Sequence, residues 1–159
     1  MVARLVRVRD RDLANVFPRW ADDRRSLAGR HEVEGAHRMS RWEDRSLRED
    51  VLANGVDDWV DAGWLRQIAQ RSAVEDGSQL RQLSIGLIAE LLVEELVVAG
   101  SIEGGKHVVW DGTPGEALVR IVGGWKEWGD EPPMPGAIVW LDLTEAGRAI
   151  GEAVLRREA

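Results

Sequence analysis

The chain of 159 residues contains no cysteine and no tyrosine, one phenylalanine and only two lysines. Without thiols it forms no disulfide, no zinc site built on thiolates and no cysteine nucleophile. It also lacks any uninterrupted run of the ~20 apolar residues that a membrane-spanning helix needs. Its arginine-rich first residues have no apolar core of the kind that a secretory signal requires. We therefore expect a cytoplasmic protein with no membrane association.

Hydrophobic residues make up 44% of the chain and charged residues 31%, which are ordinary proportions for a folding domain. The charge is unevenly distributed, because residues 1–50 hold 12 basic and 10 acidic side chains whereas residues 51–159 hold 9 basic and 18 acidic ones. An acidic domain repels phosphate backbones and anionic membranes, and it attracts basic partners. The main part of the chain therefore suits a protein partner better than nucleic acid.

Residues 1–40 carry many Arg and Asp side chains and show no sustained hydrophobic period. We predict a loosely ordered segment there, followed by one domain over residues 41–159. Met39 is an alternative natural start, so it stays open whether the first segment belongs to the natural chain.

Apolar residues at helical spacing predict three helices in the first part of this domain. The first runs from 40 or 41 to 54, and an Asn-Gly pair ends it. The second begins at a cap formed by Asp57. The third, from about Ser78 to Glu95, has a continuous leucine face and is the strongest helix prediction in the chain.

Two strands, 96–102 and 106–110, flank a glycine turn and predict a hairpin. A fourth helix is predicted from Thr113 to Gly129, because a hydroxyl cap, a proline and a glutamate three residues after the cap satisfy free backbone amides. A strand at 137–143 then leads to a last helix capped by Thr144. The residues of that helix expected to face inward are Ala146, Ala149, Ile150, Ala153 and Val154.

The segment from Gly100 to His107 has the glycine and lysine spacing of a phosphate-binding loop. His107 replaces the Ser or Thr that would hold magnesium, and the chain continues as a strand, so we interpret the segment as a plain hairpin turn. His31 and His37 are six residues apart, which is not the spacing of a helical zinc site. We therefore expect no cofactor, no metal and no catalytic residue, and we predict that the protein is not an enzyme.

The segment from Leu92 to Val98 indicates a helix that runs into a strand, and the segment from Leu141 to Arg148 indicates a strand that enters a capped helix. In this order they resemble the winged helix-turn-helix domains of bacterial repressors of the antibiotic-resistance-regulator type, over about residues 57–159. The resemblance implies an α+β fold, mainly helical and winged-helix-like, with a small antiparallel sheet and a helix inserted in the wing.

The same resemblance implies an alternative function, a transcriptional regulator that places residues 78–95 in the major groove of DNA. Its candidate DNA contacts are the polar side chains of that helix and of the hairpin: Gln79, Arg81, Gln82 and Lys106. Two features disfavour it. The third helix carries more glutamates than arginines, so few side chains are available to contact phosphates. In addition, the 27 residues between Trp110 and Ile138 include a whole predicted helix, whereas a wing that binds DNA is a compact hairpin.

The eight tryptophans are the most unusual feature of the composition. Most of those in the predicted domain lie on apolar stripes, which favours core packing; the six are Trp59, Trp64, Trp110, Trp125, Trp128 and Trp140. Trp128 lies at the end of its helix beside a proline-rich loop, so we expect it to be the exposed one that can anchor a partner.

Our leading hypothesis is a noncatalytic protein-protein interaction module with an acidic surface, such as an adaptor, an antitoxin or an immunity protein. The expected partner is another protein, a basic one if charge decides the choice. The candidate contact residues are Glu90, Glu94, Glu95 and Trp128. The oligomeric state stays open.

Overall fold

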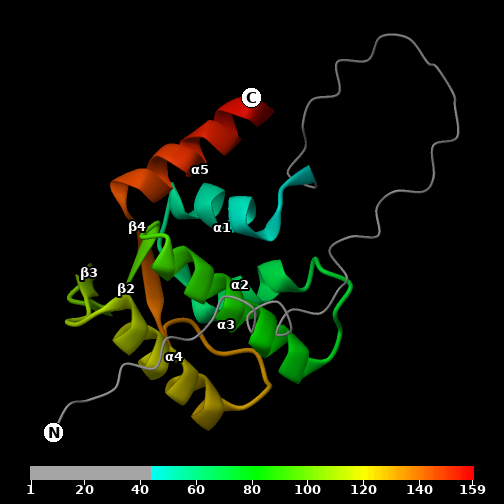
Figure 1. Ribbon diagram of the computed structural model, residues 1–159, viewed down its shortest axis with the longest axis vertical. Coiled ribbons are helices and arrows are strands. Elements are labelled where there is room, and N and C mark those ends of the chain that lie inside the picture. The colour runs from blue at the N-terminus through cyan, green and yellow to red at the C-terminus, as the bar shows by residue number, and fades with distance from the viewer. Residues whose placement is uncertain (1–43) are drawn as a thin grey trace, which may run out of the picture. The chain divides into compact units, whose positions relative to one another are not determined.

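The structure, a computed structural model, describes residues 44–159 and confirms the expected α+β class (Figure 1). The segment 1–40, expected to be loosely ordered, lies outside the described residues. Within the described part no helix has the length and apolar character needed to cross a membrane. In chain order the elements are α1 (Leu47–Gly55), β1 (Val60–Asp61), α2 (Ala62–Ala69), α3 (Gly77–Val93), β2 (Val97–Glu103), β3 (Lys106–Val109), α4 (Pro114–Trp128), β4 (Trp140–Leu143) and α5 (Glu145–Glu158).

Side-chain caps explain where the helices begin. Thr113 and Glu116 form the predicted capping box of α4, and Thr144 caps α5 as expected. Two expected starts are wrong. α1 begins at Leu47, after a Ser46 capping box, and the cap of α2 is Asp61, which accepts a hydrogen bond from the backbone of Trp64 at 2.7 Å.

The sheet is antiparallel and has the strand order β1-β4-β2-β3. β4 lies in its centre, although α4 separates it in sequence from the β2–β3 hairpin. The predicted turn between Gly100 and His107 is part of that hairpin, and it is confirmed. The imidazole of His107 lies over Gly100, and its Nε2 is 3.1 Å from the carbonyl oxygen of Trp140.

One hydrophobic core joins the sheet to α1, α2, α3 and α4. Its largest fully buried side chain is Trp125 of α4, which confirms the core prediction for this tryptophan. Trp64, expected on an apolar stripe, is instead 44% exposed at the surface of α2. Other buried side chains of the same core are Leu65, Ile88, Leu91, Ile121 and Leu141.

The face that α5 turns inward differs from the prediction, because only Val154 of the five expected residues is buried. Its other inward residues are Gly147 and Gly151. A Cβ atom at Gly147 would lie 2.0 Å from the carbonyl oxygen of Leu96, and one at Gly151 would lie 2.3 Å from that of Leu52. Glycine therefore lets α5 contact backbone directly, beside α1 (Figure 1), and the alanines and Ile150 face outward.

Candidate protein-binding surface

The carboxylates expected to bind a partner are partly neutralised within the chain. The guanidinium of Arg48 on α1 contacts both Glu90 and Glu94 of α3, with an Nη1–Oε1 distance of 3.1 Å to Glu90 and of 3.2 Å to Glu94. All three side chains are partly exposed, so these ion pairs stabilise the fold little. Arg48 nevertheless sets one positive charge against the three glutamates at this end of α3, so the charge presented to a partner falls from -3 to -2.

Glu95 differs from the other two glutamates because its backbone is held in a left-handed turn, with φ of 55°. The Thr144 hydroxyl donates a hydrogen bond to the carbonyl oxygen of Glu95 at 2.8 Å. The Thr144 backbone N–H donates to the Leu96 oxygen at 3.0 Å. The end of α3 is thereby tied to the start of α5, and the exposed Glu95 side chain has no polar contact of its own.

Trp128 lies far from these glutamates. Arg81 near the start of α3 contacts Asp130 at 3.0 Å, just after the end of α4, so the two helices run antiparallel. Glu94 is thirteen residues beyond Arg81, which is about 20 Å along a helix at ~1.5 Å per residue. The four candidate contact residues therefore do not form one surface.

The loop 129–139 that follows Trp128 is fastened to α2 and α3. Gly129 ends α4 with a positive φ of 96°. Arg66 of α2 donates a hydrogen bond from Nη2 to the carbonyl oxygen of Asp130 at 2.9 Å. Further along, Pro133 is buried, and its carbonyl oxygen lies so close to Gly63 that a Cβ there would be only 2.6 Å away. The loop is thus held near its start, at Asp130, and again at Pro133.

This loop and the ends of the neighbouring helices present exposed apolar groups among carboxylates. Trp128 is 38% exposed and Met134 is 67% exposed. Glu127 and Glu131 flank Trp128 in sequence, and Glu75 precedes the α3 start where Gly77 lies against Asp130. We call these five residues the acidic loop surface: Glu75, Glu127, Trp128, Glu131 and Met134.

Sequence reasoning found only Trp128 of this surface. The signal for Glu127 and Glu131 was present, since both stand within three residues of an exposed tryptophan. Glu75 carried no such signal, because it is distant in sequence and only the contact between the α3 start and loop 129–139 brings it near.

The charged side chains that lack a partner in the described part of the chain are mostly acidic. Residues 44–159 contain 11 basic and 21 acidic side chains. Nine of the basic ones contact a carboxylate, a carbonyl oxygen or, for Arg120, the ring of Trp110; Lys106 and Lys126 do not. Eight carboxylates have no polar contact of any kind: Asp57, Glu75, Glu95, Glu103, Asp111, Glu127, Glu131 and Glu145.

No protein-family model, curated protein or solved structure matches this chain. The chemistry of its surface is therefore the basis for inferring what it binds.

The residues expected to contact DNA are only partly available for that role. Gln79 and Gln82 are exposed on α3, and Lys106 is exposed in the hairpin. Arg81 instead faces the carboxylate of Asp130. Arg48 of α1, which contacts the end of α3, is also paired with carboxylates, so neither of these two guanidiniums is free to neutralise a phosphate.

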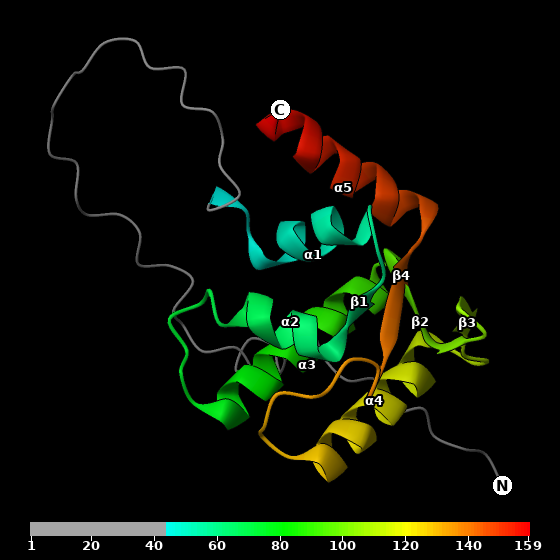
Figure 2. The same cartoon turned by 180° about the vertical axis from the view of Figure 1, so that it is seen from behind.

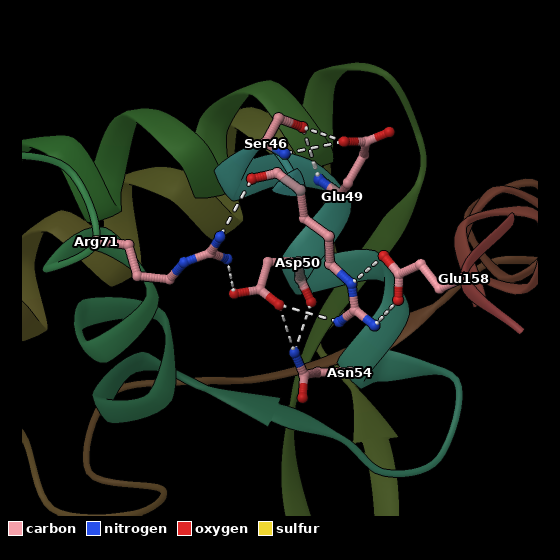
Figure 3. A network of polar contacts seen from close by, with 7 residues as sticks. Ser46, Glu49, Asp50, Asn54, Arg71 and Glu158 are labelled. Atoms are coloured by element: carbon pink, nitrogen blue, oxygen red, sulfur yellow. Dashed lines mark hydrogen bonds and ion pairs between the residues drawn. The ribbon is translucent and has the colours of Figure 1, made fainter. Parts of the chain in front are cut away.

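A pocket of about 350 Å³ between α1 and α2 is lined by charged groups that bind one another. The Arg45 guanidinium donates hydrogen bonds to Asp50 at 3.1 Å and to Glu158 at 2.7 and 2.5 Å. Figure 3 shows Asp50 in this network, with Arg71 on one side and Glu158 on the other. Arg71 contacts the other oxygen of Asp50, and Asn54 also donates to this carboxylate. Because the polar atoms are directed at each other, the cluster connects α1, α2 and α5 and is a structural feature of the fold.

The contacts of the Glu49 carboxylate are expected to make the stability of the fold depend on pH. The Arg157 guanidinium donates to this carboxylate at 2.8 Å and the Ser46 backbone donates at 2.9 Å, and together they lower the pKa of Glu49 from 4.5 to about 2. Because the folded pKa lies below the unfolded one, the stabilisation is complete above about pH 4.5 and is lost as the pH falls toward 2.

We expect the free energy of unfolding of the wild type to decrease over that range, and that of Glu49→Gln to decrease less steeply. Urea unfolding at pH values from about 5.5 to about 2.5 measures both slopes. Glu103→Gln, on the hairpin, is the control and should keep the wild-type slope, since Glu103 has no polar contact. Equal slopes for wild type and Glu49→Gln would contradict the assignment.

Proposed function

We propose that this protein is a noncatalytic protein-binding module, and that its acidic loop surface receives a basic segment of the partner. The observation that carries the proposal is the imbalance among charged side chains without a polar contact: eight carboxylates against two lysines in the described residues. Such a surface attracts a basic protein and repels nucleic-acid phosphates.

The composition of the acidic loop surface supports this function. Tryptophan is among the residues most enriched at binding hot spots, and the exposed Trp128 has carboxylates on both sides in sequence. Met134 has a flexible side chain that adapts to different apolar groups. Because the contacts of Asp130 and Pro133 hold the loop, little conformational entropy is lost when a partner binds.

The test compares variants of the full chain as baits in a lysate of the source organism, followed by affinity measurement with the purified partner. We expect the wild type to capture a basic protein, and Trp128→Ala and Glu131→Lys each to weaken its binding roughly 10- to 100-fold. Glu103→Lys, a charge reversal on the distant hairpin, is the matched control and should bind like the wild type. Retention of full affinity by Trp128→Ala and Glu131→Lys would refute the proposed surface.

A second candidate function is a winged-helix-like DNA-binding regulator, favoured by the order of elements and by the exposed Gln79 and Gln82 near the start of α3. Glutamine side chains at such a position can read adenine edges in the major groove. This alternative predicts that the purified chain retards one DNA fragment, and that Gln82→Ala reduces this binding more than Lys126→Ala does. If no basic protein is captured and this pattern is found, the DNA-binding function replaces the first.

A further inference from the structure

A shallow groove of about 770 Å³ lies at the end of the domain opposite to the acidic loop surface, where α3 ends and α5 begins. Its walls are mainly apolar and include two carboxylates that have no polar partner, those of Glu95 and Glu145. The lining residues are Leu92, Glu95, Val97, Val98, Pro114, Thr144, Glu145, Ala146 and Ala149.

The apolar wall of this groove continues along α5. Ile150 and Ala153 follow Ala146 and Ala149 at helical spacing, and all four are exposed. The glycine face of α5 already packs against α1, so this second apolar face has no partner within the described chain. Both views show α5 at the edge of the domain with α1 beside it (Figures 1 and 2).

The net charge of α5 also suits a contact between two copies of this acidic chain. Residues 44–159 carry 10 more acidic than basic side chains, but α5 itself carries three of each sign. Two identical surfaces with an excess of one sign repel each other, whereas two neutral helices do not. The charge distribution therefore favours α5 as a contact between copies.

The charges of α5 are arranged so that the helix complements itself. Glu145 is in its first turn and Arg156 in its last, eleven residues apart, which places them on the same side of the helix. In an antiparallel pair of α5 helices that cross near Ile150, each Glu145 faces Arg156 of the other copy. The Arg156 side chain is 69% exposed, and its contact with Glu152, at 3.5 Å, is an exposed pair that contributes little.

We propose that a second copy of this chain docks on this face, so that two α5 helices pair antiparallel around a two-fold axis near Ile150. Each groove receives the last turn of the other α5, and Arg156 of that turn meets Glu145 at the groove wall. The alanines let the two helices approach closely, and the same patch serves both copies, as a two-fold contact requires. The proposal does not depend on the partner of the acidic loop surface.

The experiment measures the molar mass of the full chain by sedimentation and by light scattering. We expect twice the mass of one chain for the wild type and for the control Glu103→Arg. Ile150→Asp, Glu145→Arg and Arg156→Glu should each weaken dimerisation at least tenfold. An equal mixture of Glu145→Arg and Arg156→Glu should restore dimers, because every pair of facing residues in the mixed dimer has opposite charges.

Recovery in the mixture distinguishes a specific contact from a folding defect, since each variant alone must be folded to contribute to a dimer. A wild-type mass of one chain at concentrations up to roughly 1 mM, the weak limit for a specific association, would overturn the proposal. So would an undiminished dimer in Ile150→Asp, or a mixture of the two folded charge variants that stays monomeric.

Discussion

Replacing Gly147 by alanine is expected to destabilise the protein by about 3 kcal/mol or more, at the upper end of what overpacking costs. The added Cβ would lie 2.0 Å from the carbonyl oxygen of Leu96, which is backbone and cannot rotate away. α5 must then move off the start of β2, and the packing of Val154 in the core is lost with it. Gly151→Ala meets the Leu52 carbonyl at 2.3 Å and should behave similarly. Denaturant unfolding monitored by tryptophan fluorescence measures the change.

The matched controls are Gly86→Ala in α3 and Gly123→Ala in α4. Both glycines lie inside helices, are exposed, and have no atom within 4 Å of an added Cβ. Alanine at such a position stabilises a helix by roughly 0.5–1 kcal/mol relative to glycine. If Gly147→Ala and Gly151→Ala also prove neutral or stabilising, the close approach of α5 to the backbone of its neighbours is wrong.

The second large effect is expected for Asp50→Ala, which should lower the free energy of unfolding by roughly 3 kcal/mol. Asp50 is 7% exposed and accepts hydrogen bonds from Arg45, Arg71 and Asn54. Its removal leaves two partly buried guanidiniums without this carboxylate. The loss falls at the low end of the range for a broken buried ion pair, because Arg45 keeps Glu158 and Arg71 is 23% exposed.

Glu90→Ala is the control for Asp50→Ala. It removes a carboxylate that is also 3.1 Å from an arginine, but both side chains of this pair are at least 32% exposed. We expect the free energy of unfolding to change by no more than about 0.5 kcal/mol, since water stabilises the separate charges of an exposed pair almost as well as the ion pair does. Equal losses in the two variants would show that the Asp50 cluster does not act as a buried network.

Much of the fold could be predicted because local rules decide it. The capping box at Thr113, the cap at Thr144 and the glycine turn of the hairpin depend on residues within a few positions of each other. The helical period of α4 was sufficient to identify Trp125 as a core residue. β1 was missed because a strand of two residues exists only through its pairing with β4.

The candidate sites were less predictable, since they depend on contacts between distant segments. Sequence composition showed an acidic chain, but not that Arg48 of α1 pairs with two of the expected glutamates. Hydrophobicity favoured Ala146 and Ile150 over Gly147 as the inward residues of α5. The reverse holds, because the backbone of Leu96 approaches too closely for any side chain.

The amino-acid sequence by itself determined the α+β class, the order of most elements and the acidic character of the chain, since caps, turns and hydrophobic periods act over short stretches. Only the tertiary structure decided which face of α5 is covered and which charges are compensated. It also decided that Trp128 and Glu95 lie at opposite ends of the domain. The physical reason is that burial and ion pairing depend on which segments meet in space, and that information is not contained in any one segment.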